Sequence, residues 1–219
     1  MNKLPKYIIC CFLLISSSVY TQDKLKLGLN IGGQLTSLRG FEFEVEDDFE
    51  IAPFFGVNIE VKLFENLYVV TAFNFETITK KTELAFYDSS STGVRNQEVK
   101  EKYEFFNIPL QLRWKFGPNK MFFIDAGGFM NYFNKGKPND FTPLFINFEN
   151  YNYGISFGAG AVFPITRKTD LSFQIRNDLG LSRVNKFQNQ IPGEIKTNSL
   201  RISATYSFGF WWFKKPKNL

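Results

Sequence analysis

The 219-residue chain contains no histidine, and this removes most of the side-chain chemistry that a membrane enzyme would use. Ser-His-Asp acyl transfer, histidine-assisted proteolysis and histidine-containing metal sites all need an imidazole. Both cysteines, Cys10 and Cys11, lie in an apolar stretch near the N-terminus, so neither thiol chemistry nor disulfides are expected in the rest of the chain. We therefore expect no enzymatic activity, no cofactor and no metal centre.

The densest group of carboxylates lies between residues 42 and 50. Six acidic side chains occur there, and Phe41, Phe43 and Val45 alternate with the first of them. Carboxylate oxygens bind divalent cations, although the ligand spacing of an EF-hand is missing. The other interpretation is a solvated hairpin extension, and it is favoured because charge runs commonly face water.

Eight segments alternate apolar and polar residues, which predicts β-strands with two different faces. The segment 106–116 is the clearest, with six apolar residues at every second position. Interior glycines and β-branched residues, with no apolar repeat at three and four, disfavour helices. The apolar sets fall in these ranges: 25–35, 55–63, 67–75, 106–116, 122–132, 153–163, 171–179 and 200–210.

The connections between these segments alternate in length. Long links cover 36–53, 80–102, 133–152 and 182–198, whereas short links cover 64–66, 117–120 and 164–170. Long loops on one side of a membrane and tight turns on the other are typical of transmembrane barrels. We predict an all-β fold, an eight-stranded antiparallel up-and-down transmembrane β-barrel.

The face opposite the apolar one distinguishes this barrel from a soluble one, whose interior holds large apolar side chains. Here that face carries small, amide and charged residues, and an apolar exterior is what hydrocarbon requires. Because isolated buried charges are costly, we expect a paired network in the lumen. Lys26, Lys62 and Lys115 face the same way, and the expected network consists of Glu60, Glu76, Arg113, Asp125, Arg176, Asp178 and Arg201.

The N-terminal residues predict export. Lys3 and Lys6 precede an apolar run that is too short to span a bilayer, and small residues follow it. We expect a signal peptide over residues 1–21 and one barrel domain over 22–219, in the bacterial outer membrane. Loss of this signal lowers the net charge from +5 to +3. So mild a charge implies no nucleic-acid partner.

Aromatic residues indicate where the barrel is expected to meet the membrane–water interfaces and where a loop could contact another protein. Tyr68, Trp114 and Phe163 are expected in a turn-side girdle, and Tyr132 and Tyr153 in a loop-side girdle. The third long loop is itself aromatic, so it is either a docking surface for another protein or a set of rings that pack on neighbouring loops. The candidate docking residues are Phe141, Phe145, Phe148 and Tyr151.

Four segments resemble the PorT-like outer-membrane β-barrel family of Bacteroidota-type bacteria. They are residues 27–33 (LGLNIGG), 107–114 (NIPLQLRW), 125–128 (DAGG) and 156–160 (SFGAG). The resemblance covers nearly the whole chain after the predicted signal, and it implies an accessory role in outer-membrane assemblies such as type IX secretion. Pro109 fits the family, but proline cannot donate to a strand ladder, so we expect a bulge or a barrel end there.

Three functions remain open at this point. The first is a non-enzymatic accessory or scaffolding component of an outer-membrane assembly, whose partners are the lipid bilayer and another outer-membrane protein or a secretion complex. The second is a surface adhesin or ligand-binding barrel that acts through its extracellular loops. The third is a small channel, which the nearly balanced inward charges disfavour, because an eight-stranded barrel is just wide enough for its own side chains.

Overall fold

The computed structural model describes residues 25–39, 48–49, 51–87, 94–137, 149–166, 168–184 and 194–209. Its strands are β1 (Leu25–Arg39), β2 (Asp48–Phe49), β3 (Ala52–Lys62), β4 (Leu67–Tyr87), β5 (Val94–Phe116), β6 (Phe122–Lys137), β7 (Tyr151–Pro164), β8 (Thr169–Gly180) and β9 (Lys196–Gly209). Among the described residues, no helix is long and apolar enough to cross a membrane.

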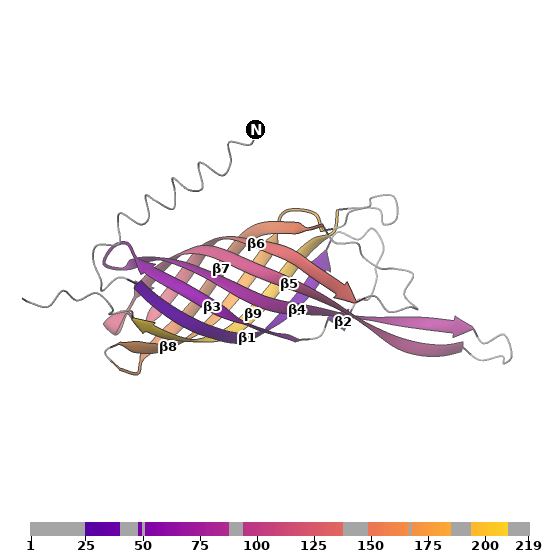
Figure 1. Cartoon of the computed structure of the whole chain (residues 1–219), viewed down its shortest axis with the longest axis horizontal. Helices are drawn as coiled ribbons and strands as arrows, with labels where there is room; N and C mark the ends of the chain where they lie inside the picture. Colours follow the sequence, from indigo (N-terminus) through magenta and orange to yellow (C-terminus); the bar gives the residue numbers. More distant parts are fainter. Residues whose placement is uncertain are drawn as a thin grey trace, which may run out of the picture.

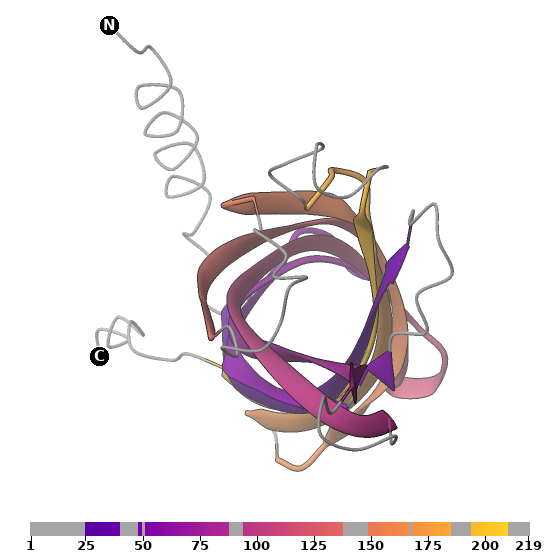
Figure 2. The same cartoon turned by 90° about the vertical axis from the view of Figure 1, so that its right-hand side faces the viewer.

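Eight of these strands close into an antiparallel barrel, seen end-on in Figure 2. Chain neighbours pair with each other, and β1 closes the ring against β9, while the two-residue β2 adds to the edge of β4. If one starts at Leu25 of β1 and moves from each residue to its paired residue on the next strand, one turn around the barrel leads back to β1 at Leu35. This stagger tilts the strands, as Figure 1 shows, and the predicted fold is confirmed.

The three short links occur where the sequence predicts them, although the third covers 165–168 and not 164–170. They are tight turns at one end of the barrel, after β3, β5 and β7. In the turn between β5 and β6, Gly117 has a φ of 77°, a left-handed conformation that favours glycine, and a 3₁₀ turn follows at Pro118–Lys120. These turns fix the register in which the inward side chains of neighbouring strands meet.

The strands extend further on the loop side than the sequence predicts. The prediction of a loop over 80–102 is wrong for most of that range, because β4 continues to Tyr87 and β5 begins at Val94. These ends pair from Thr79 with Lys102 to Tyr87 with Val94. They form a two-stranded ribbon that projects beyond the barrel at the right of Figure 1.

The outer face of the barrel is an apolar belt between two aromatic boundaries. Trp114 and Phe163 lie at the turn end, and Tyr132 and Tyr153 at the loop end. Tyr68 does not belong to this girdle, since Lys115 lies over its ring on the lumen side. The exposed belt includes Leu29, Ile31, Phe55, Val57, Leu110, Leu112, Ile124, Phe157, Ile175 and Ile202.

Pro109 lies within β5 and not at a bulge, so that prediction is wrong. Leu110 pairs with Thr71 of β4, but Pro109 and Ile108 have no paired residue in β4. Pairing begins again at Asn107, which faces Asn74, and the register is unchanged. The Thr71 hydroxyl donates to the Pro109 carbonyl at 2.8 Å. A side-chain hydrogen bond thus joins the strands where the proline interrupts the ladder. The only register shift between β5 and β6 in the described residues lies at Glu104 and Phe105.

Candidate functional site

The turn-side half of the lumen holds a four-residue charge cluster from β3, β5 and β6. Arg113 makes a two-point contact with Asp125, from Nε at 2.9 Å and from Nη2 at 2.8 Å. Its Nη1 donates to Glu60 at 3.0 Å, and Lys115 Nζ donates to the other Glu60 oxygen at 2.5 Å. All four residues are buried, so each charge depends on its partners and not on water.

The loop-side half holds a second cluster, from β4, β8 and β9. Arg201 binds Glu76 with both terminal nitrogens, and its Nε lies 2.8 Å from Asp178. Arg176 Nη2 also donates to Asp178, at 3.0 Å. Ser156 donates to the second Asp178 oxygen at 2.6 Å. Arg201 is 1% exposed and is among the most deeply buried side chains of the described chain.

A ladder of amide side chains extends the loop-side cluster across the lumen. The ladder runs across four strands, in which Asn30 donates to Asn74, Asn74 to Asn107 and Asn107 to Asn131, at 2.6, 3.1 and 2.7 Å. Arg176 joins this ladder by donating to Asn107 at 3.0 Å. These bonds tie the loop-side charges to the inner faces of β1, β4, β5 and β6.

A separate ion pair lies at the turn end of the lumen. Lys26 of β1 binds Asp170 of β8. The sequence interpretation placed Asp170 in the turn 164–170, but β8 begins at Thr169 and directs Asp170 inward. With this pair, each of the five cations Lys26, Arg113, Lys115, Arg176 and Arg201 has an acidic partner in the lumen. Among the described residues, Lys62 at the end of β3 makes no ion pair.

The space between the clusters is small. A cavity of about 20 Å³ is bordered by Asn58, Gln111 and Arg113 on the turn side and by Arg176 and Arg201 on the loop side. A volume of this size holds about one water molecule. The paired side chains thus fill the lumen at this level.

The loop end of the lumen holds apolar side chains beside the buried polar residues Thr36, Asn152 and Thr197. Tyr103 and Phe105 of β5 are buried there, and so are Val184 after β8 and Ile195 before β9. A backbone hydrogen bond of 2.8 Å from Val184 to Ile195 joins the chain on both sides of the fourth loop. The sequence interpretation missed these residues, because they lie outside or at the ends of the segments that alternate.

Of the four candidate docking residues, Tyr151 lies in the described part of the chain. Tyr151 is the first residue of β7, where its ring packs on Tyr132 with centroids 5.3 Å apart. Phe141, Phe145 and Phe148 lie outside the described residues, as do the signal segment and most of the acidic segment. Asp48 lies in β2. The described part of the chain contains no group of three potential metal ligands among Asp, Glu and Cys.

Comparison with known proteins assigns the fold to a family. The family model described as the outer membrane protein beta-barrel domain matches residues 8–208. The chain belongs to this family. It is a bacterial outer-membrane β-barrel, embedded in the lipid bilayer. The model covers outer-membrane barrels in general and does not single out the PorT-like group.

Solved structures show the same architecture. The outer-membrane β-barrel is similar to OprG of Pseudomonas aeruginosa, with a TM-score of 0.52, 10% identity, and 85% of this chain and 98% of that chain covered. It is also similar to the outer membrane protein AlkL, whose structure was determined in lipid bilayers, with a TM-score of 0.51, 10% identity, and coverage of 88% and 94%. No curated protein matches the sequence. At these identities the likeness shows the fold alone.

The outer-membrane β-barrel also places three phenylalanines on its polar inner face. Phe54, Phe123 and Phe129 are buried, each directly opposite a glycine of the neighbouring strand. A Cβ at those glycines would approach each ring to 2.7 Å or less; the pairs are Phe54 with Gly32, Phe123 with Gly160 and Phe129 with Gly154. Rings that cover cross-strand glycines are a known device in curved sheets. In the sequence, such a ring is recognisable as a single aromatic residue on the polar face of a strand. The glycine that it covers can be identified only when the pairing register of the strands is known.

Proposed function

We propose that this protein is a non-enzymatic anchor in the outer membrane, and that it presents the β4–β5 ribbon to a partner protein of an outer-membrane assembly. The observation that carries the proposal is the extension of β4 and β5 beyond the barrel, which is the longest extension among the described residues. Membership of the PorT-like group and a role in type IX secretion stay predictions within this proposal.

The ribbon has open edges. Pairing of β5 with β6 ends at Lys102, and β2 covers β4 only at Lys80 and Lys81. Beyond these points, Thr82–Tyr87 pairs only with the facing residues of β5, as far as the described residues go. Unpaired strand edges accept a strand from another chain, and a two-stranded ribbon is marginally stable alone. An added strand would satisfy backbone groups that the barrel leaves to water.

The lumen supports an anchoring role over a conducting one. Two buried ion-pair clusters fill the middle of the barrel, and Tyr103, Val184 and Ile195 are buried at its loop end. Solute passage would require these pairs to separate, and each unpaired buried charge is costly. A small channel is therefore the weakest of the three functions.

The proposal is tested by shortening the ribbon. Replacing residues 83–98 with Asn-Gly joins Thr82 to its paired residue Val99 through a two-residue hairpin turn. The tagged full-length and shortened proteins are crosslinked in intact outer membranes, and the captured proteins are identified and counted. The proposal expects a stoichiometric partner that the shortened protein loses.

A matched control distinguishes loss of the ribbon from general damage. The same Asn-Gly replacement of residues 166–168 joins Ile165 to Thr169 at the opposite end of the barrel, keeps the register of β7 and β8, and should leave capture unchanged. Equal capture by the shortened protein and the wild type would reject the ribbon as the docking element. Binding of a soluble surface ligand, in place of a membrane protein, would favour the adhesin alternative.

A further inference from the structure

A second candidate site lies on the outer wall, away from the ribbon. A groove of about 670 Å³ crosses β1, β3, β4 and β5 on the face that points away from the lumen. Two cross-strand rows form its sides. The loop-side row is Phe55, Phe75 and Phe106, and the turn-side row is Leu29, Val57 and Phe73.

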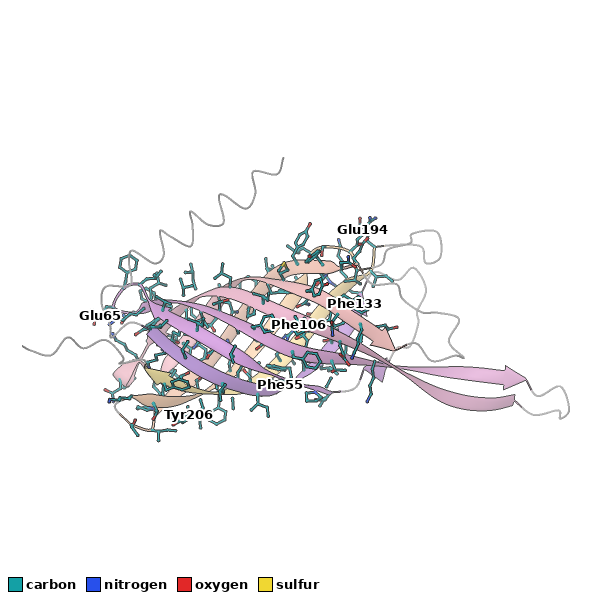
Figure 3. The ribbon with its side chains drawn as sticks, viewed as in Figure 1. Phe55, Glu65, Phe106, Phe133, Glu194 and Tyr206 are labelled. Carbon is teal, nitrogen blue, oxygen red and sulfur yellow. The ribbon has the colours of Figure 1, made fainter. Side chains whose placement is uncertain are left out.

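The loop-side row is held rigidly by ring contacts. The Phe55 and Phe75 centroids lie 5.5 Å apart, and those of Phe75 and Phe106 lie 5.7 Å apart. Phe73 stacks on Phe106 at 5.0 Å with an interplanar angle of 22°. Figure 3 shows Phe55 and Phe106 on the same side of the barrel. Interlocked rings keep the groove from collapsing.

Gly56 forms the floor of the groove. Gly56 is an inward position of β3, since a Cβ there would come within 2.4 Å of the lumen-facing Asn74 Oδ1 and 2.3 Å of the Phe73 carbonyl oxygen. On the outer face it therefore contributes only backbone, between the outward side chains of Phe55 and Val57.

The position of the groove along the barrel indicates which part of the membrane surrounds it. Phe106 pairs with Tyr132, which belongs to the tyrosines at the loop end of the belt. Long loops of such barrels are extracellular, so the groove lies in the outer-leaflet half of the membrane. Leu29, Phe55 and Val57 are more than half exposed on this face and are continuous with the lipid-facing belt.

We propose that this groove binds one acyl chain of an outer-membrane lipid as an ordered ligand. The lining residues are apolar except Asn30, whose side chain bonds to Asn74 on the lumen side, and the groove opens onto hydrocarbon, so the occupant enters from the bilayer. A flexible chain fills a narrow groove between rings with many dispersion contacts, which a smooth wall does not offer. This site is independent of the function proposed for the ribbon.

The test uses the purified full-length protein in phosphatidylethanolamine vesicles, with a fraction of the lipid carrying a diazirine near the end of one acyl chain. After photolysis, mass spectrometry maps the labelled residues. Occupancy predicts a several-fold excess of label at Val57 and Phe73 over Ile175 of β8, which is similarly exposed. Val57→Trp should abolish the excess by filling the groove, whereas Ile175→Trp should preserve it.

Three other outcomes would overturn the proposal. Equal labelling of Val57 and Ile175 would mean that only bulk lipid contacts the wall. A crosslinked dimer mapped to the groove would assign this face to a second copy of the chain. Persistence of the excess in the Val57→Trp variant would place the ordered lipid elsewhere. Circular dichroism confirms that both variants fold, so that lost label reports on the groove.

Discussion

The two parts of β4 and β5 differ in how many neighbours each strand has. Within the barrel, both strands pair on both sides and bury charged or apolar side chains in the lumen. In the ribbon, Thr82–Tyr87 and the facing residues of β5 pair, within the described part of the chain, only with each other. One pair of strands thus contributes both to the closed wall and to an open-edged projection. We infer that stability resides in the first part and recognition in the second.

The largest expected contrast is in amide hydrogen exchange. Amides of Thr82–Tyr87 should exchange faster than those of Val70–Glu76 by roughly three orders of magnitude or more, because the ribbon opens locally while the barrel opens only on unfolding. Exchange measured by mass spectrometry in lipid vesicles resolves the two parts. Equal protection would show that the ribbon is as stable as the wall.

Removing a buried cation should cost the barrel most of its stability margin. Arg201→Met leaves Glu76 without its ion pair and Asp178 with one cation fewer, and we expect a loss of about 3–5 kcal/mol in the free energy of unfolding. Urea unfolding followed by tryptophan fluorescence measures this loss. The control is Arg183→Met, whose exposed pair with Glu149 at 3.9 Å should be worth less than about 1 kcal/mol. Similar effects for both variants would contradict the closed network.

A smaller loss is expected where a ring covers a glycine. Gly160→Ala places a methyl group against the Phe123 ring and the Phe173 carbonyl, and overpacking of this kind costs about 1–3 kcal/mol. Gly209→Ala is the control, since its nearest atom is the Lys168 carbonyl oxygen at 3.7 Å. The same unfolding assay applies, and an unchanged Gly160→Ala protein would mean that the wall is not closely packed there.

The smallest effect on stability is expected from shortening the ribbon. Replacing residues 83–98 with Asn-Gly removes backbone pairs that only stabilise the ribbon itself, so the free energy of unfolding of the barrel should change by less than about 1 kcal/mol. A large loss would indicate that the ribbon is part of the folding unit and would weaken the division between wall and projection.

The sequence predicts the wall well because its two faces meet different surroundings. In 106–116, every outward residue is apolar and most inward residues are polar, so the strand and its orientation can both be read. The ribbon gives no such signal. Both of its faces lie outside the barrel wall, and the segments around Thr82 and Val99 lack a regular apolar period, which made the range look like a loop.

The sequence predicts which residues point into the lumen, but it does not predict which of them contact one another. Inward charges follow from alternation, but the meeting of Arg201 with Glu76, 125 residues apart, depends on the stagger of the closed barrel. Asp170 was missed because the start of β8 was assigned to the turn. The glycine-covering rings were missed because an aromatic on the polar face has no partner until the register is fixed.

The closed lumen is the central claim, and conductance tests it most directly. Purified full-length protein is inserted into a planar bilayer, and current is recorded over a range of voltages. Paired charges and buried apolar residues at the loop end predict no unitary openings above the baseline of the protein-free membrane. Reproducible openings that scale with the amount of inserted protein would contradict the closed lumen and restore the channel as the leading function.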